Sequence, residues 1–112
     1  ADLQLDTFNF NSGTMSCLSL KTGLPILTLP GNTYSSRITA SVLKVLGLEE
    51  LIATSEENYL EIAKHLSTNR HLIVNLKKRI LSLQSNSPYF DSLKYCVDLE
   101  NVFMEMINNK NL

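Results

Sequence analysis

The order of apolar and polar positions along the chain predicts short strands in the first third and helices afterwards. Residues 1–6 alternate apolar and polar side chains, as a short strand does, and residues 24–29 form a brief apolar run bounded by glycine and proline. Between these segments, residues 14–22 fit a helix that ends at Gly23. Strand, loop, helix and strand within about 30 residues is the spacing of a βαβ unit, so we expect an open α/β sheet.

Helical periodicity dominates the rest of the chain. Asn32 or Thr33 fits the cap of a helix that reaches about Leu46, and residues 48–53 fit either a last strand or a buried connector. Three more helices are predicted with these starts and buried positions: a Thr54–Glu57 capping box before Tyr59, Ile62, Ala63 and Leu66; a cap at Thr68 or Asn69 before Leu72, Leu76, Ile80 and Leu83; and a start near Asp91 before Tyr95, Leu99, Val102, Phe103 and Met106. No repeat or linker divides the chain, so we expect a single domain over residues 1–112.

Composition limits the classes of function. The 112 residues are 44% hydrophobic and carry a formal net charge of −1, enough for one compact core and unlike the strongly basic face of a nucleic-acid binder. The basic cluster at residues 77–79 fits a solvated helix face. No apolar run approaches the roughly 20 residues that a membrane-spanning helix needs. We therefore expect neither nucleic acid nor a membrane as a partner.

The cysteines and histidines do not form a recognisable site. Cys17 and Cys96 lie far apart in sequence, and His65 and His71 do not complete a metal-ligand pattern with them. Neither cysteine has an identifiable histidine or acid partner for nucleophilic catalysis. We expect free thiols, a cytoplasmic location, no metal and no catalytic residue within this chain.

The loop after the first predicted strand is the first candidate binding site. It enters a helix with Asn11, Ser12, Gly13, Thr14, Met15 and Ser16. Free amides and the dipole at a helix N-terminus attract phosphate, and the hydroxyls of Ser12, Thr14 and Ser16 can donate to phosphate oxygens. Serine, threonine and glycine also build ordinary capping turns, so both interpretations stand on the residues alone.

The loop after the second predicted strand is the second candidate. Residues 30–37 follow the carboxyl end of that strand, where ligands of open α/β sheets bind, so this loop could line the same cleft. Arg37 lies about one turn into the predicted helix, where it could pair with a ligand anion or serve the structure.

Both loops belong to a longer ordered pattern. The chain carries, in this order, Ala1-Asp2-Leu3-Gln4-Leu5-Asp6-Thr7, Asn11-x-Gly13-Thr14, Gly23-Leu24-Pro25 and Pro30-Gly31-Asn32-Thr33-x-x-Ser36-Arg37. Together these segments resemble the C-terminal end of the O-linked N-acetylglucosamine transferase and SPINDLY family, whose members show A-D-x-x-L-D-T, N-G-H-T-T or G-G-T-T-T, G-x-P, and P-G-E-T-x-x-S-R. Residues 46–53, 59–63 and 87–90 continue the resemblance, which therefore covers nearly the whole chain.

The resemblance implies a fold and an activity. The fold would be GT-B, two Rossmann-like halves, and this chain would be a partial Rossmann-like C-terminal half with short parallel strands followed by a mostly helical C-terminal region. Members transfer a sugar, usually N-acetylglucosamine from UDP-GlcNAc, to Ser or Thr hydroxyls of proteins, and SPINDLY-type members can use a fucosyl donor. Thr14 and the amides of Gly13 and Met15 would hold the donor diphosphate, Asn11 and Ser12 would shape the loop, and Arg37 is a lesser candidate.

The resemblance also sets what this chain lacks. The acceptor groove and the lysine that neutralises the leaving diphosphate belong to parts of the family upstream of this segment, as do the tetratricopeptide repeats of many members. We therefore expect an acceptor protein to bind outside this chain, and the chain alone to transfer no sugar. The first strand would lack its neighbours in the complete sheet, which leaves self-association of the fragment open.

Four residues depart from the family pattern. Gly13 stands where many members have His, Met15 replaces a second Thr, and Asn32 replaces the Glu of P-G-E-T. Leu18 stands where an acid is expected near the nucleotide ribose. These departures support an alternative, a degenerate non-catalytic relative that acts as a protein-interaction module.

Overall fold

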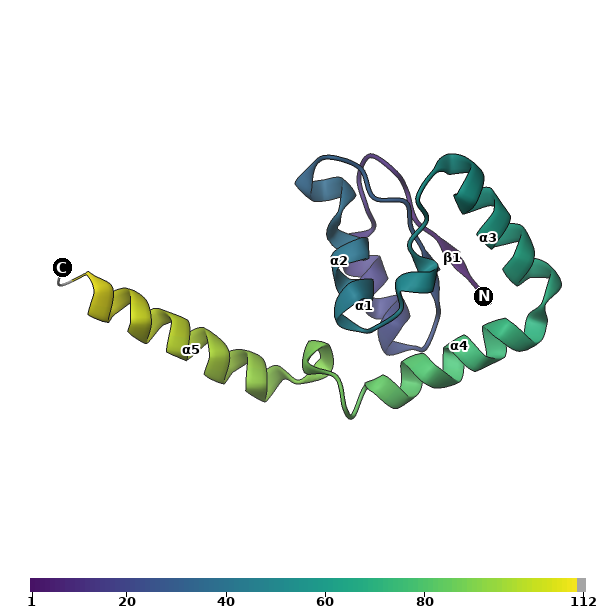
Figure 1. The fold of residues 1–112 in the computed structure, drawn as a ribbon. Helices are drawn as coiled ribbons and strands as arrows, with labels where there is room; N and C mark the ends of the chain where they lie inside the picture. Colours follow the sequence, from purple (N-terminus) through teal and green to yellow (C-terminus); the bar gives the residue numbers. More distant parts are fainter. Residues whose placement is uncertain (111–112) are drawn as a thin grey trace.

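A computed structural model describes residues 1–110, in which short strands are followed by helices (Figure 1). In chain order the elements are β1 (Gln4–Leu5), α1 (Gly13–Lys21), β2 (Ile26–Leu27), η1 (Tyr34–Ser36), α2 (Ile38–Val45), η2 (Glu49–Leu51), α3 (Glu56–Thr68), α4 (Arg70–Leu83), η3 (Pro88–Phe90) and α5 (Ser92–Asn109), where η denotes a 3-10 helix. The predicted order of strands and helices is confirmed.

A small parallel sheet anchors the first third of the chain. β1 pairs with β2 in parallel, with Gln4 opposite Ile26, and Thr28 forms a further parallel bridge to Ile52. Residues 48–53 thus combine both predicted possibilities, because η2 is a short connector and Ile52 then pairs like a strand. β1 lies at the edge of this sheet, as expected for a strand without its other neighbours.

Two glycines end helices in the left-handed conformation, where glycine avoids the steric penalty of other residues. Gly23 follows α1 with φ 84°, and Gly47 follows α2 with φ 71°. A Cβ atom at Gly23 would also lie 2.8 Å from Cγ of Leu81 in α4, so this position needs glycine for space as well. The predicted stop at Gly23 is confirmed, and Gly47 lies directly after the predicted end of the second helix near Leu46.

The hydrophobic core lies where α2, η2 and α4 meet the sheet. Its fully buried members are Leu20, Ile26, Leu43, Leu48, Leu51 and Ile80. The predicted stripe of α4 is confirmed, since Leu76 and Ile80 are buried and Leu72 and Leu83 pack against the same cluster.

Two predicted helix starts were wrong in detail. The second loop first forms η1, capped by Thr33 and Ser36, and α2 begins only at Ile38. The cap of α3 is one residue later than predicted: Ser55 Oγ accepts from the Asn58 amide at 3.0 Å. The predicted cap position Asn69 does immediately precede α4, although its side chain donates to the His65 carbonyl at 2.8 Å and makes no side-chain cap of α4.

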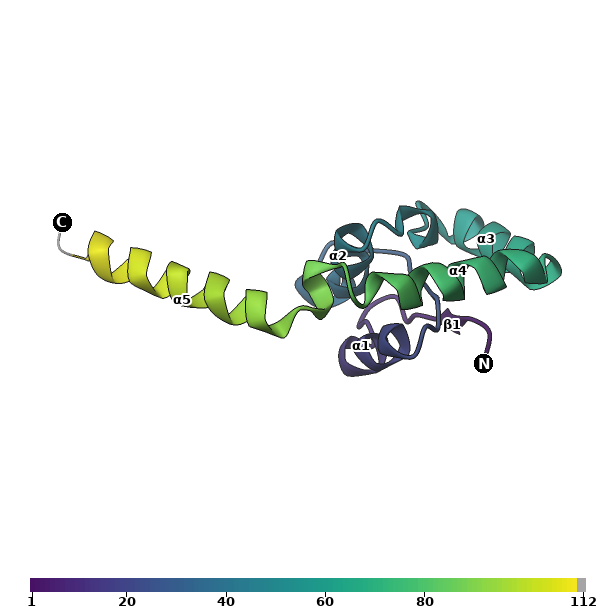
Figure 2. The same ribbon diagram turned by 90° about the horizontal axis from the view of Figure 1, so that it is seen from below.

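The predicted burial of α5 was also wrong. No residue of α5 is buried, and the expected buried positions are exposed, with Tyr95 at 64% and Phe103 at 53%. Figures 1 and 2 both show α5 projecting away from the rest of the molecule, which extends 58 Å along its longest axis. The amphipathic pattern correctly predicted a helix, but no described part of this chain covers its apolar face.

Candidate functional site

The two strand-end loops lie side by side. The Asn11 amide donates to the Ser35 carbonyl at 2.8 Å, and Asn11 Oδ1 accepts from the Thr39 amide, at the start of α2, at 3.2 Å. Asn11 is only 1% exposed, so its side chain links the loops and is closed to a ligand. Its predicted role in shaping the loop agrees with this geometry.

The N-terminus of α1 presents two free backbone donors. The Gly13 amide donates to the Asn11 carbonyl at 2.9 Å, and the Ser16 amide donates to the Ser12 carbonyl at 2.6 Å. The amides of Thr14 and Met15 have no hydrogen-bond partner among residues 1–110, and both residues are exposed. The donors available to an anion are therefore Thr14 and Met15, and the amide of Gly13 is already used.

The hydroxyls expected around this helix start differ in availability. Ser16 is buried, and its Oγ lies 3.4 Å from Thr39 Oγ1, so it faces the interior. Ser12 precedes α1 but forms no side-chain cap. This turn is therefore not an ordinary serine cap. Of Ser12, Thr14 and Ser16, Thr14 is the exposed residue.

Arg37 closes its own loop. Its Nη1 donates to the Gly31 carbonyl at 2.7 Å, while the rest of the residue is exposed. A Cβ atom at Gly31 would lie 2.7 Å from Ser36 Oγ, so the loop is also packed tightly against η1. Of the two roles predicted for Arg37, this geometry supports the structural one.

Sequence reasoning missed Asp6, which is 4% exposed. This carboxylate lies at the end of β1, and the Tyr59 hydroxyl donates to its backbone carbonyl at 3.1 Å. Burial, and next the charge of Asp6, raise the pKa of Tyr59, so that hydroxyl keeps its proton for this hydrogen bond. The sequence did show a charged residue where the first strand meets the loop. In an alternating strand pattern, however, such a residue looks like any solvent-facing polar position.

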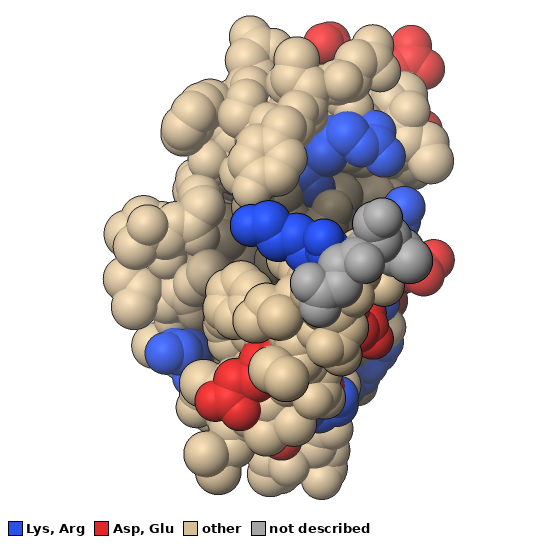
Figure 3. Space-filling view, turned by 90° about the vertical axis from the view of Figure 1, so that its left-hand side faces the viewer, with Lys and Arg blue, Asp and Glu red and all other residues tan. Residues whose placement is uncertain are grey.

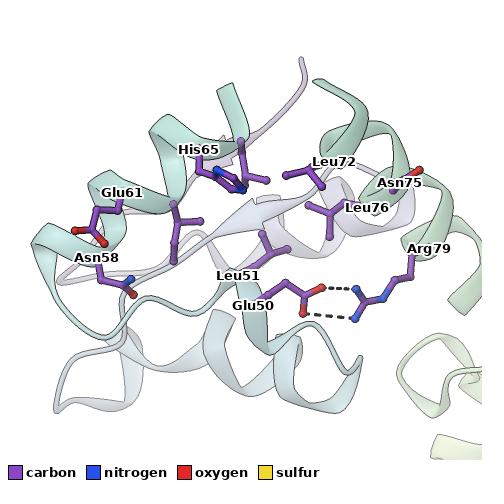
Figure 4. A pocket seen from close by; sticks show the side chains of 11 residues that line it. Glu50, Leu51, Asn58, Glu61, His65, Leu72, Asn75, Leu76 and Arg79 are labelled. Atoms are coloured by element: carbon purple, nitrogen blue, oxygen red, sulfur yellow. Dashed lines mark hydrogen bonds and ion pairs between the residues drawn. The ribbon is translucent and has the colours of Figure 1, made fainter. Parts of the chain in front are cut away.

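A separate cavity of about 470 Å³ lies between α3, α4 and η2 (Figure 4). Leu51, Leu72 and Leu76 point into it, and Arg79 pairs with Glu50 at one end. No residue of the two strand-end loops lines it. The apolar lining of this cavity can hold a hydrophobic group. The sequence did not predict the cavity, because its lining residues come from three separate elements.

On the face shown in Figure 3, several Lys and Arg side chains gather around a hollow in the upper half of the view, whereas Asp and Glu side chains lie mostly toward the edges. In the basic cluster, Lys77 pairs with Asp2 at 2.9 Å and Arg79 pairs with Glu50. Within residues 1–110 there is no group of three potential metal ligands, and none of the helices combines the length and apolar character needed to cross a membrane.

Comparison with known proteins assigns this arrangement to a family. The family described as glycosyl transferase family 41 matches residues 1–99. The chain belongs to glycosyltransferase family 41. Both strand-end loops lie inside the matched range, so the resemblance drawn from their motifs is confirmed.

Individual relatives agree with this assignment. The chain is 34% identical over 105 residues to a probable UDP-N-acetylglucosamine–peptide N-acetylglucosaminyltransferase SPINDLY of Solanum lycopersicum, covering 94% of this chain and 11% of the relative. It is 34% identical over 106 residues to the UDP-N-acetylglucosamine–peptide N-acetylglucosaminyltransferase of Caenorhabditis elegans, covering 95% of this chain and 9% of the relative. The chain therefore spans about a tenth of the length of these family 41 proteins.

A solved structure places the fold as well. A mutant O-GlcNAc transferase of Thermobaculum terrenum matches with a TM-score of 0.81 and 30% identity, over 94% of this chain and 20% of that one. The fold is thus that of one part of a GT-B glycosyltransferase, as the resemblance implied.

Proposed function

We propose that this chain is the donor-binding portion of a family 41 protein O-glycosyltransferase. The observation that carries the proposal is the pair of unpartnered amides of Thr14 and Met15, at the α1 N-terminus beyond the carboxyl end of β1. Two aligned N–H groups and the helix dipole would hold a diphosphate, and the Thr14 hydroxyl would add a third donor. Charge that develops on the leaving diphosphate would be stabilised by the same groups.

The donor that we propose is UDP-GlcNAc, and the acceptor is a protein hydroxyl. The names of the Solanum lycopersicum and Caenorhabditis elegans relatives both describe a UDP-N-acetylglucosamine–peptide transferase. No metal is proposed, because backbone amides and the helix dipole would carry out the charge stabilisation. The chain alone is expected to transfer no sugar, since residues 1–110 place no candidate acid–base pair at this site. Measurable turnover by the purified chain would contradict this.

Calorimetric titration of the full-length protein with UDP, GDP and their sugar conjugates tests the proposal. We expect UDP and UDP-GlcNAc to bind in the micromolar range and GDP to bind more weakly. Replacement of Thr14 by Ala should weaken UDP binding about ten- to hundredfold, the value of one hydrogen bond to a charged group. A folded full-length protein that binds none of these nucleotides would refute the proposal.

The same region favours a second candidate function, a protein-interaction module without catalysis. Met15 is 59% exposed and Leu18 is 51% exposed, so two apolar side chains lie on the accessible side of α1 beside the free amides. Exposed apolar side chains at this place suit a protein surface better than a ribose. Absence of nucleotide binding, with the full-length protein folded, would favour this function.

We further propose that the isolated chain associates with a second copy of itself through α5. Its apolar stripe is long, since 18 residues of helix extend about 27 Å, and a net charge of −1 gives little repulsion between copies. The stripe is formed by Tyr95, Leu99, Val102, Phe103 and Met106, all exposed. An exposed stripe of this kind is typical of a helix that pairs with another.

Light scattering after size-exclusion chromatography tests this association. The isolated chain should run as a dimer or larger, and Leu99→Glu with Phe103→Glu should give a monomer because two charges interrupt the stripe. Asn101→Glu with Asn108→Glu adds the same two charges to the opposite face of α5 and should leave the association unchanged. A monomeric wild-type chain would contradict the proposal.

We also place the protein in the cytoplasm. Cys17 and Cys96 are both unpaired and exposed, as is usual where thiols stay reduced. The Tyr89 hydroxyl donates to Cys17 Sγ at 2.8 Å, so this thiol already has a partner that needs no disulfide.

A further inference from the structure

A buried carboxylate lies directly behind the start of α1. The Asp6 side chain accepts three hydrogen bonds: Oδ1 from the amides of Thr7 and Ser12, both at 3.0 Å, and Oδ2 from Thr28 Oγ1 at 2.9 Å. Asp6 and Thr28 are 4% and 0% exposed. A carboxylate so far from water is retained at low cost only where hydrogen bonds replace its hydration, and these three donors do so.

These hydrogen bonds join the sheet to the helix start. Ser12 is the residue immediately before α1, so fixing its N–H fixes where the helix begins and how its first turn is directed. Thr28 follows β2, in the centre of the sheet, and is itself held by backbone bonds to Leu51 and Ala53 at 3.0 and 2.8 Å. The Asp6 carboxylate therefore links the sheet, through Thr28, to Ser12, the residue immediately before α1.

We propose that Asp6 is a positioning residue for donor binding, which rests on the function proposed above. It directs the free amides of Thr14 and Met15, two and three residues beyond Ser12, toward the diphosphate without touching the donor itself. The requirement is for acceptor geometry rather than charge. An asparagine at position 6 could keep one oxygen toward Thr7 and Ser12, while its amide group donated to the Thr28 hydroxyl, which can also accept.

The test is titration of the full-length protein with UDP, together with thermal unfolding. Asp6→Ala removes all three hydrogen bonds, and we expect the Kd for UDP to rise about tenfold or more. Asp6→Asn is the conservative variant and should restore the Kd to within about threefold of wild type. A role confined to stability would instead lower the unfolding temperature and the fraction of molecules that bind, while the Kd of the folded molecules stayed the same.

A second pair of variants keeps the test decisive if Asp6→Ala does not fold. Thr28→Val removes only the hydroxyl on Oδ2 and should raise the Kd for UDP several-fold, whereas Thr28→Ser keeps that hydroxyl and should match wild type. An unchanged Kd in both Thr28→Val and any folded Asp6→Ala protein would overturn the positioning role and leave the proposed function standing. Absence of UDP binding by the folded wild-type protein would overturn both.

Discussion

Replacement of Gly13 by Asp in the full-length protein is expected to weaken UDP binding roughly ten- to hundredfold without destabilising the fold. Gly13 is the first residue of α1, and a Cβ atom there would meet nothing within 4 Å. The new carboxylate would lie beside the amides of Thr14 and Met15, where it would repel the diphosphate and compete for the same donors. An acidic residue at a helix start adds about 0.3–1 kcal/mol of stability through the dipole, so binding and stability should move in opposite directions.

Gly13→Asn provides the matched control for this change. Asparagine has nearly the same size and shape but no charge, and it fits the same open space. We expect its UDP affinity to stay within a few-fold of wild type, measured in the same calorimetric titration. Equal affinities for Gly13→Asp and wild type would mean that the diphosphate does not bind at this end of α1.

The fold could be predicted from sequence where local signals and tertiary structure agree. The β1–α1–β2 unit follows from a buried apolar run and from Gly23, whose left-handed conformation ends α1. The apolar stripe of α5 correctly predicted a helix but wrongly predicted that its side chains are buried. Periodicity shows that one face of a helix is apolar, but it does not show whether another element covers that face. Phe103 is therefore exposed although its spacing is that of a core position.

The candidate site was predicted less completely than the fold. The loop before α1 was located from its composition and motif, and Thr14 and Met15 do present free amides. Gly13 and Ser16 were expected to donate hydrogen bonds to the diphosphate. The Gly13 amide instead donates to the Asn11 carbonyl, and the Ser16 hydroxyl faces the interior. Hydrogen-bond partners depend on which segments meet in three dimensions. The same reason explains why Asp6, whose partners lie as far away as Thr28, was not found from sequence.

Replacement of Leu43 by Ala should cost about 2–5 kcal/mol of unfolding free energy, because it removes buried atoms and leaves a cavity. Leu43 is 0% exposed in the main cluster, where α2 packs against η2 and α1. Alanine favours helix as strongly as leucine does, so α2 itself should not be weakened. Urea unfolding of the 112-residue chain, followed by circular dichroism, measures the loss.

Val45→Ala is the control for this prediction, since Val45 lies in the same helix and is 61% exposed. It should change the unfolding free energy by no more than about 0.5 kcal/mol. A similarly small loss for Leu43→Ala would mean that α2 is not packed as described. The consequence would reach the site, because Thr39 of α2 donates to Asn11 Oδ1 and so helps to hold the loop before α1. Under the proposed function, donor binding would then depend on a buried core residue as well as on the loop before α1.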